Sequence, residues 1–297
     1  MKTPVGGYRF SRKIKASQGM HFRREVETLF MILGSNAPEN ESDLEMQKRT
    51  WISDLLPSQG YLVLRGSPSA SPTLVGTDLH LPVTESYDNI LLKTILGMKW
   101  ALENSNFDVL IRTNVSTYFP PSKVDVIARS IDRTTLFFGG YVDICRLPGE
   151  NRIATTEYVA GTALVLTRPT VQMLCNIDWK LYSGWPDDLA ISIALHNAGV
   201  SPKRFRRNNL SQLHFFLPAF QIRLKTSSVS YLSSKRMESL HGYFHATSLL
   251  GKLGRYVIIS TNEIRYAFMN WEEISGFAKE LFSHARKVLQ RIVRLGK

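Results

Sequence analysis

Hydrophobic positions are patterned most clearly between residues 85 and 120. Five apolar side chains recur there at spacings of 4, 4, 3 and 4 residues, which places them on one face of a helix: Tyr87, Leu91, Ile95, Met98 and Leu102. Ile90, Leu92 and Leu96 make the other faces apolar as well. We therefore expect a helix that is covered on more than one side and that ends at the polar residues 104–106.

A short strand is predicted directly after this helix. Phe107–Arg112 carries apolar residues on both faces, as expected of a strand inside a mostly parallel sheet. At its carboxyl end the chain becomes polar, through Asn114 and Ser116. Ligands of open α/β sheets bind at the carboxyl ends of the strands. The pattern therefore predicts a central strand with a binding site at Asn114–Ser116.

The rest of the chain also alternates between strands and helices. Strands are predicted at 28–33, 61–64, 136–141 and 158–166, and helices at 42–55, 123–131 and 187–198. The first of these helices is predicted to start at a capping box, Ser42-x-x-Glu45. The alternation predicts an α/β fold, a three-layer sandwich around a mostly parallel sheet. We place one domain at 27–250, between a basic extension at 1–26 and a second extension at 251–297.

Composition narrows the choice of partners. The chain has 43% hydrophobic residues, a net charge of +12 and a pI near 9.7. A phosphorylated substrate or an anionic membrane explains this charge better than nucleic acid, because no basic motif interleaved with aromatic residues is present. Cys145 and Cys175 lack metal-binding or redox spacing, which is typical of buried thiols in a reducing compartment.

Several segments, in order, resemble the beta-1,3-galactosyltransferase and fringe glycosyltransferases. Residues 48–51, KRTW, resemble the family's Arg-x-Thr-Trp, and residues 86–94, SYDNILLKT, resemble Ser-Tyr-x-Asn-Leu-x-Leu-Lys-Thr. Residues 158–167, YVAGTALVLT, resemble Tyr-x-x-Gly-x-x-Tyr-Val-Leu-Ser, and residues 185–192, WPDDLAIS, resemble the segment with the paired acids. Residues 223–245 resemble the closing segment, so the resemblance covers about 28–245.

The resemblance implies a GT-A-type, Rossmann-like fold and an inverting hexosyltransferase. Such an enzyme transfers a hexose or N-acetylhexosamine from a UDP-sugar to a glycan acceptor, here with a β-1,3 linkage in surface or capsular polysaccharide synthesis. It implies Asp188 as the catalytic base. The nucleotide-sugar-binding residues it implies are Arg49, Lys93, Arg112, Asn114, Ser116, Gly161 and Asp187. The local pattern leaves alternatives open, because Gly161 also suits a β-bulge and the two acids also suit a helix start.

The metal site departs from the family pattern. The family's two metal-binding aspartates are replaced by Asn114 and Ser116, whose neutral side chains would bind Mn²⁺ or Mg²⁺ weakly. Either Asp187 and His241 retain the ion, or Arg49, Lys93 and Arg112 replace it, so we expect weak or absent metal dependence. His241 and His245 are spaced to share a helix face, as metal or phosphate ligands or as an interfacial pair. The alternative to an enzyme is a catalytically inactive relative that binds a glycan or a nucleotide sugar.

The two ends of the chain suggest where in the cell the protein acts. Residues 1–26 are basic without an apolar run, so we expect neither a signal peptide nor a membrane anchor. With the resemblance, this indicates a cytoplasmic enzyme of bacterial type. Residues 277–297 form an amphipathic pattern with a basic face. Such a helix either binds the inner face of an anionic membrane, where a lipid-linked acceptor is expected, or packs on the domain.

Overall fold

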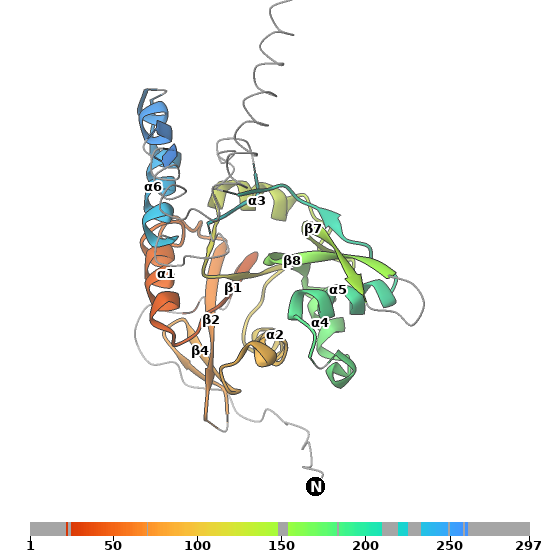
Figure 1. The fold of residues 1–297 in the computed structure, drawn as a ribbon. Coiled ribbons are helices and arrows are strands. Elements are labelled where there is room, and N and C mark those ends of the chain that lie inside the picture. The colour runs from red at the N-terminus through yellow and green to blue at the C-terminus, as the bar shows by residue number, and fades with distance from the viewer. Residues whose placement is uncertain are drawn as a thin grey trace, which may run out of the picture.

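The centre of the fold is a sheet of eight strands in the order β3-β4-β2-β1-β5-β8-β7-β9. A computed structural model describes residues 22, 25–69, 71–147, 154–182, 184–209, 219–224, 233–248, 250–257 and 259–260 (Figure 1). The strands of the sheet are β1 (Thr28–Leu33), β2 (Gln59–Ser67), β3 (Thr73–Val75), β4 (Asp78–Pro82), β5 (Val109–Asn114), β7 (Phe138–Leu147), β8 (Ala154–Thr167) and β9 (Lys203–Arg204). Parallel pairing joins β4, β2, β1 and β5, and β5 lies between β1 and β8. The predicted mostly parallel sheet with this central strand is confirmed.

Helices cover both faces of the sheet and make three layers (Figure 1). One face carries α2 (Ile90–Asn104), α4 (Arg168–Cys175) and α5 (Asp187–Asn197). The other carries α1 (Pro38–Arg49), α3 (Pro121–Arg129) and α6 (Ser233–His245). Two 3-10 turns, η1 (Tyr87–Asn89) and η2 (Trp179–Tyr182), precede α2 and α5. The three-layer α/β sandwich predicted from the sequence is therefore confirmed.

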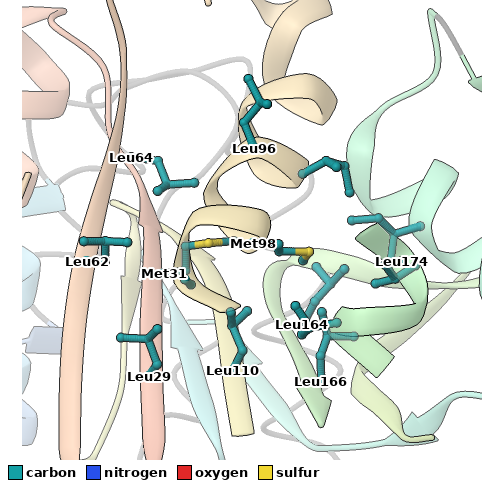
Figure 2. Close-up of a cluster of buried hydrophobic side chains, with 14 of the residues drawn as sticks. Leu29, Met31, Leu62, Leu64, Leu96, Met98, Leu110, Leu164, Leu166 and Leu174 are labelled. Atoms are coloured by element: carbon teal, nitrogen blue, oxygen red, sulfur yellow. The ribbon is translucent and has the colours of Figure 1, made fainter. Parts of the chain in front are cut away.

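The apolar core on the α2 face explains why that helix is apolar on several sides. Figure 2 shows side chains of the central strands, including Met31 and Leu110, packed beneath Met98 of α2. The same helix also contacts α4 and α5. Gly97 allows α2 to approach β2 closely, because a Cβ there would lie 2.5 Å from a methyl group of Leu64. A larger residue at this position would push α2 away from the sheet.

The structure corrects the predicted start of the first helix. α1 begins at Pro38, not at Ser42, and it ends at Arg49 instead of near residue 55. Proline suits the first turn of a helix because that turn needs no backbone N–H donor, and the acidic Glu39 and Glu41 favour the same end. The capping-box interpretation was therefore wrong. The edge strand β3, its neighbour β4 and the helix α4 were not predicted.

A second, three-stranded sheet brings later segments to the end of β5. It consists of β6 (Thr117–Tyr118), β10 (Arg207–Asn209) and β11 (Gln221–Arg223), in the order β10-β11-β6. β10 runs parallel to β11, and β11 runs antiparallel to β6. Because β6 follows β5 almost directly, this sheet places two late strands beside the carboxyl end of the central strand.

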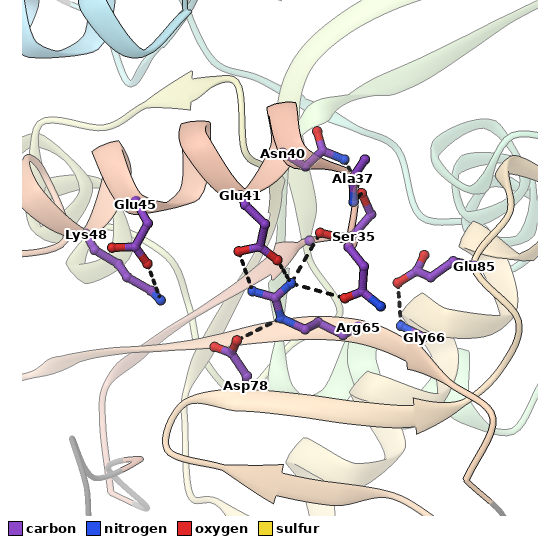
Figure 3. Close-up of polar contacts among 12 residues, drawn as sticks. Ser35, Ala37, Asn40, Glu41, Glu45, Lys48, Arg65, Gly66, Asp78 and Glu85 are labelled. Atoms are coloured by element: carbon purple, nitrogen blue, oxygen red, sulfur yellow. Dashed lines mark hydrogen bonds and ion pairs between the residues drawn. The ribbon is translucent and has the colours of Figure 1, made fainter. Parts of the chain in front are cut away.

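A buried arginine connects the start of α1 to the sheet (Figure 3). Arg65 on β2 is 5% exposed and donates hydrogen bonds to Asp78 Oδ2 at 2.7 Å, to Ser35 O at 3.2 Å and to both carboxylate oxygens of Glu41. Because Arg65 pairs with both Asp78 and Glu41, its positive charge is compensated inside the protein. The loop between β1 and α1 is thereby fixed at the carboxyl end of the sheet.

Some predictions concern residues outside the described part of the chain. The amphipathic helix at 277–297 and most of the basic extension at 1–26 lie outside it, and the domain boundaries stay predictions. Within the described residues, no helix has both the length and the apolar character that crossing a bilayer requires. Cys145 and Cys175 form no disulfide with a described residue, and both are half-buried instead of buried as predicted.

Candidate functional site

A cavity of about 1020 Å³ opens at the carboxyl ends of β1 and β5. Its lining comes from residues within 33–43, 85–93 and 112–116, from the middle of β8 and the start of α5, and from Asp143, Arg207 and Arg223. Asn114 and Ser116 lie in its lining, at the end of the central strand. Ligand pockets are commonly of this size and occur at this edge of α/β sheets. The cavity is therefore our candidate site.

A buried ion pair crosses the back of the cavity. Arg112 of β5 is 3% exposed, and its guanidinium donates to Asp187 Oδ2 and to the carbonyl of Gly161. Thr94 of α2 donates to the same Asp187 oxygen at 3.1 Å. The charge of Asp187 is thus neutralised by Arg112, and the pair joins β5 to the start of α5.

The neighbouring acid has different partners. Asp188 Oδ2 accepts a hydrogen bond from the backbone N–H of Gly161 at 2.7 Å, and its Oδ1 accepts one from the N–H of Leu189 at 2.9 Å. Burial, followed by the charge of Asp187, raises the pKa of Asp188, and Arg112 opposes this rise. A carboxylate with a raised pKa takes up a proton more readily than an ordinary aspartate. The group suits a general base at the surface of the cavity.

Gly161 lies where these two acids and Arg112 meet. It falls within the irregular stretch of the β7–β8 pairing, where the register shifts opposite residues 140–142. A Cβ at this position would lie 2.6 Å from Arg112 Nη1 and 3.1 Å from Asp188 Oδ2. The absence of a side chain therefore leaves room for the guanidinium and the carboxylate.

Lys93 of α2 also lines the cavity, but it already has partners. Its ammonium donates to Glu85 Oε2 and to the carbonyl of Gly34, both at 2.8 Å. Lys93 is 4% exposed, so its positive charge interacts mainly with protein groups and little with solvent. Its structural effect is to hold the end of β1 and the start of α2 together at the rim of the cavity.

Two further arginines line the cavity and were not among the predicted site residues. Arg207 of β10 and Arg223 of β11 are half-buried, and neither forms an ion pair with a described residue. Arg207 stacks over the ring of Tyr141 at 3.6 Å, and its Nε has no hydrogen-bond partner among described atoms. Burial lowers the pKa of Arg207, and the charge of Arg223 lowers it further, while Tyr141, Asp143 and Tyr158 oppose this shift. The sequence signal for this cluster was the dense basic run at 203–207.

The polar turn after β5 does not fit a divalent cation. Asn114 Oδ1 accepts hydrogen bonds from the N–H of Ser116 at 3.1 Å, from the Ser116 hydroxyl at 3.1 Å and from the Thr117 hydroxyl at 2.9 Å. An amide oxygen has two lone pairs, which these three donors occupy. Neither side chain carries charge, and hard cations bind neutral oxygen ligands more weakly than carboxylates. A metal site at Asn114 and Ser116 is therefore not supported.

Two predicted site residues lie away from the cavity. Arg49 is exposed at the last position of α1, whereas the opposite end of that helix, near Glu39, borders the cavity. Asp43 is the last residue of α1 in the cavity lining, and the six steps from it to Arg49 correspond to about 9 Å along the helix. His241 lies on α6, which packs against α1, and does not line the cavity. The structure thus does not join His241 to Asp187 or Asn114 as a metal ligand.

No protein-family model matches the sequence, and no curated protein matches it. Among solved structures, it is similar to a glycosyltransferase involved in the glycosylation of the major capsid of PBCV-1, with 8% identity over 71% of this chain and 98% of that chain, at a TM-score of 0.43. It is also similar to a putative glucose-1-phosphate thymidylyltransferase from Bacillus anthracis (8% identity, 72% and 95% of the chains, TM-score 0.40).

A third structure is the inositol-1-phosphate CTP transferase from T. maritima, at 10% identity over 75% of this chain and 98% of that chain, with a TM-score of 0.39. All three identities are 10% or lower.

Proposed function

We propose that the protein is an inverting glycosyltransferase that transfers a hexose or N-acetylhexosamine from a UDP-sugar to a hydroxyl group of a glycan acceptor. One observation carries this proposal: a carboxylate with a raised pKa and two arginines that form no ion pair with a described residue line the same cavity. Direct displacement at an anomeric carbon needs both kinds of group. The base accepts the proton of the acceptor, and the cations stabilise the departing diphosphate.

Asp188 is the proposed base. It takes the proton from the acceptor hydroxyl while the hydroxyl oxygen forms a bond to the anomeric carbon of the donor. The bond between that carbon and the diphosphate oxygen breaks, and its electron pair leaves with UDP. The proton later passes from Asp188 to solvent. Because the acceptor attacks opposite the leaving group, the configuration at the anomeric carbon inverts.

Arg207 and Arg223 are the proposed partners of the diphosphate. Arg112 already pairs with Asp187, and Lys93 already pairs with Glu85. The positive charges of both residues are therefore largely compensated within the protein. Arg223 is paired across the small sheet with Thr117, immediately after the polar turn that contains Asn114 and Ser116. Its positive charge therefore lies near the place where the resemblance would put a metal ion. Guanidinium groups bind phosphate oxygens through paired hydrogen bonds.

This arrangement supports transfer without a bound divalent ion at Asn114 and Ser116. The resemblance to the beta-1,3-galactosyltransferase and fringe enzymes supports the β-1,3 linkage and a role in surface or capsular polysaccharide synthesis. An inactive relative that binds nucleotide sugars remains the second candidate, favoured by the loss of the two aspartates at positions 114 and 116.

Release of UDP from a panel of UDP-sugars, with a glycan acceptor, tests the proposal. We expect wild-type protein to release UDP at the same rate with and without Mn²⁺. Asp188→Asn should bind UDP normally but release it about 10²- to 10⁴-fold more slowly, the usual effect of losing a general base. Binding without turnover by the wild type would favour the inactive relative, and near-normal turnover by Asp188→Asn would exclude Asp188 as the base.

A further inference from the structure

Three potential metal ligands lie together on the side of the molecule where α6 packs against α1. Asp54 follows the end of α1, and His241 and His245 project from α6 one turn apart. Asp54 Oδ2 lies 2.6 Å from His245 Nε2 and 3.6 Å from His241 Nδ1. The two imidazole rings are 4.3 Å apart between centroids. Two segments nearly 190 residues apart in sequence thus present two nitrogens and one carboxylate oxygen to each other.

The spacing of these atoms is close to that of a zinc site. All three ligand atoms lie within 4.8 Å of one another. Tetrahedral zinc with bonds of about 2.0–2.2 Å holds its ligand atoms about 3.4 Å apart. The 3.6 Å separation already matches, and the 2.6 Å separation needs to lengthen by about 0.8 Å when an ion replaces the shared proton.

The remaining coordination position is open to water. The side chain of His245 is 57% exposed, whereas those of His241 and Asp54 are 22% and 28% exposed. Tyr118 lies on the inner side, with its hydroxyl 3.3 Å from His241 Nδ1 and its ring stacked on Phe244. The two histidines therefore have one protein-covered side and one side that faces solvent.

This cluster is separate from the cavity. None of its three residues lines the cavity, which borders the opposite end of α1. Neither Asn114 nor Asp187 belongs to it. Among the described residues, it is the one group of three or more acidic, histidine or cysteine side chains close enough to share an ion.

We propose that Asp54, His241 and His245 form a zinc site that fastens α6 to the end of α1. Two imidazole nitrogens and a carboxylate oxygen are the donor types that zinc prefers, with water as the fourth ligand. The site joins α6 to α1, whose other end borders the cavity, so the ion would stabilise this side of the fold. It takes no part in the transfer chemistry proposed above.

The first experiment measures Zn²⁺ binding to the full chain by calorimetry, after a chelator has been used and removed. We expect one strong equivalent and a rise in Tm when Zn²⁺ is added, because binding to the folded state alone stabilises it. Co²⁺ should give the visible absorption of a tetrahedral complex. Absence of a strong equivalent, or no change in Tm, would overturn the proposal.

Variants then locate the site. His241→Ala, His245→Ala and Asp54→Asn should each weaken Zn²⁺ binding by about 100-fold or more, since loss of even an outer-sphere partner costs about 10- to 100-fold. His80→Ala, which removes a half-buried histidine of β4, is the matched control and should bind like wild type. A variant that combines all three substitutions should bind no Zn²⁺ at this site. Equal Zn²⁺ binding by this triple variant and the wild type would place the zinc elsewhere and overturn the assignment.

A conservative variant separates a metal site from a simple hydrogen-bonded contact. Tyr118→Phe keeps the ring and its stacking but removes the hydroxyl that faces His241 Nδ1. A metal ion would use that same nitrogen lone pair, so this variant should bind Zn²⁺ at least as tightly as wild type. A tenfold or greater loss of affinity in Tyr118→Phe, with the fold intact by circular dichroism, would contradict coordination by Nδ1.

Discussion

Asp188 accepts a hydrogen bond from the backbone N–H of Gly161 at 2.7 Å, while Asp187, the residue before it, pairs with Arg112. Adjacent acids at the start of α5 thus point to different partners. One carboxylate is neutralised inside the protein, and the other lines the cavity without a cationic partner among the described ion pairs. This division separates a structural role for Asp187 from the chemical role that we propose for Asp188, and it leads to different expectations for the two substitutions.

Asp187→Ala should destabilise the protein strongly. It leaves the buried Arg112 guanidinium without its counter-charge, which typically costs about 3–5 kcal/mol. The free energy of unfolding, measured by urea denaturation with circular dichroism, should fall by this amount. A loss below about 1 kcal/mol would show that Arg112 finds another partner or is hydrated in the folded state.

Asp188→Asn should gain stability relative to the wild type as pH rises. Because the folded-state pKa of Asp188 is raised, its contribution to stability is full below the unfolded pKa and is lost as pH rises through the folded pKa. Asparagine has no such pH dependence, although its single amide oxygen can accept only one of the N–H bonds from Gly161 and Leu189, which costs the variant the same stability at every pH. Thermal unfolding of both proteins at acidic pH and at pH 7 checks this, and a Tm difference that does not move in favour of Asp188→Asn at pH 7 would contradict it.

The acid limb of the transfer reaction should report the same group. A base must be deprotonated, so kcat/KM should fall as pH drops through the pKa of Asp188, which burial and Asp187 raise above its ordinary value of 3.8. UDP binding, measured over the same pH range, is the control because it does not need this carboxylate. An acid limb at or below pH 3.8 would mean that another group limits the rate.

The fold was predictable because its strongest pattern lies in the buried centre. The strand at 28–33 was predicted with its observed bounds, and the apolar residues at 107–112 identified the central strand. α1 was misplaced because its pattern is weak and the start signal at Pro38 competes with Ser42. β3 and β4 were missed because strands of three and five residues are too short to show a clear alternation of apolar and polar residues.

The candidate site was predictable only in part, since it combines local motifs with distant pairing. The sequence motifs pointed to Asn114, Gly161 and the acids at 187–188, and all of these residues line the cavity. Arg207 lies in a basic run at 203–207, but that run does not show where the residue lies in the fold. Arg207 and Arg223 reach the cavity because β10 pairs with β11, and β11 pairs with β6, about 100 residues earlier in the chain. Arg49 was placed by its motif alone, and helix length carries it away from the cavity.

Gly161→Ala should lower activity through its two neighbours. Its Cβ would lie 2.6 Å from Arg112 Nη1, and Arg112 is held by Asp187, so the shift is expected to reach Asp188 as well. A displacement of about 1 Å in a catalytic group typically costs about 10²-fold in rate. Gly254→Ala is the control, because nothing lies within 4 Å of a Cβ there. Equal activity of both variants would show that Arg112 and Asp188 can shift to accommodate the added Cβ without loss of activity.

Arg207→Gln and Arg223→Gln should weaken UDP binding. A hydrogen bond to a charged group contributes about 1.5–3 kcal/mol, so each substitution should raise the Kd for UDP by about 10- to 100-fold. Uridine, which lacks the diphosphate, should bind equally to all variants. Arg204→Gln is the matched control, since Arg204 is exposed and paired with Glu157 outside the cavity.

Metal dependence completes the test of the arginine pair. If Arg207 and Arg223 supply the charge that stabilises the diphosphate, Mn²⁺ should not restore UDP binding to the glutamine variants, because Asn114 Oδ1 already accepts three hydrogen bonds. The measurement is repeated in the His245→Ala background, so that an ion bound by Asp54 and the two histidines does not affect the result. Full recovery of affinity with Mn²⁺, lost again in Asn114→Ala, would show instead that the altered turn binds the metal and that the arginines act beside it.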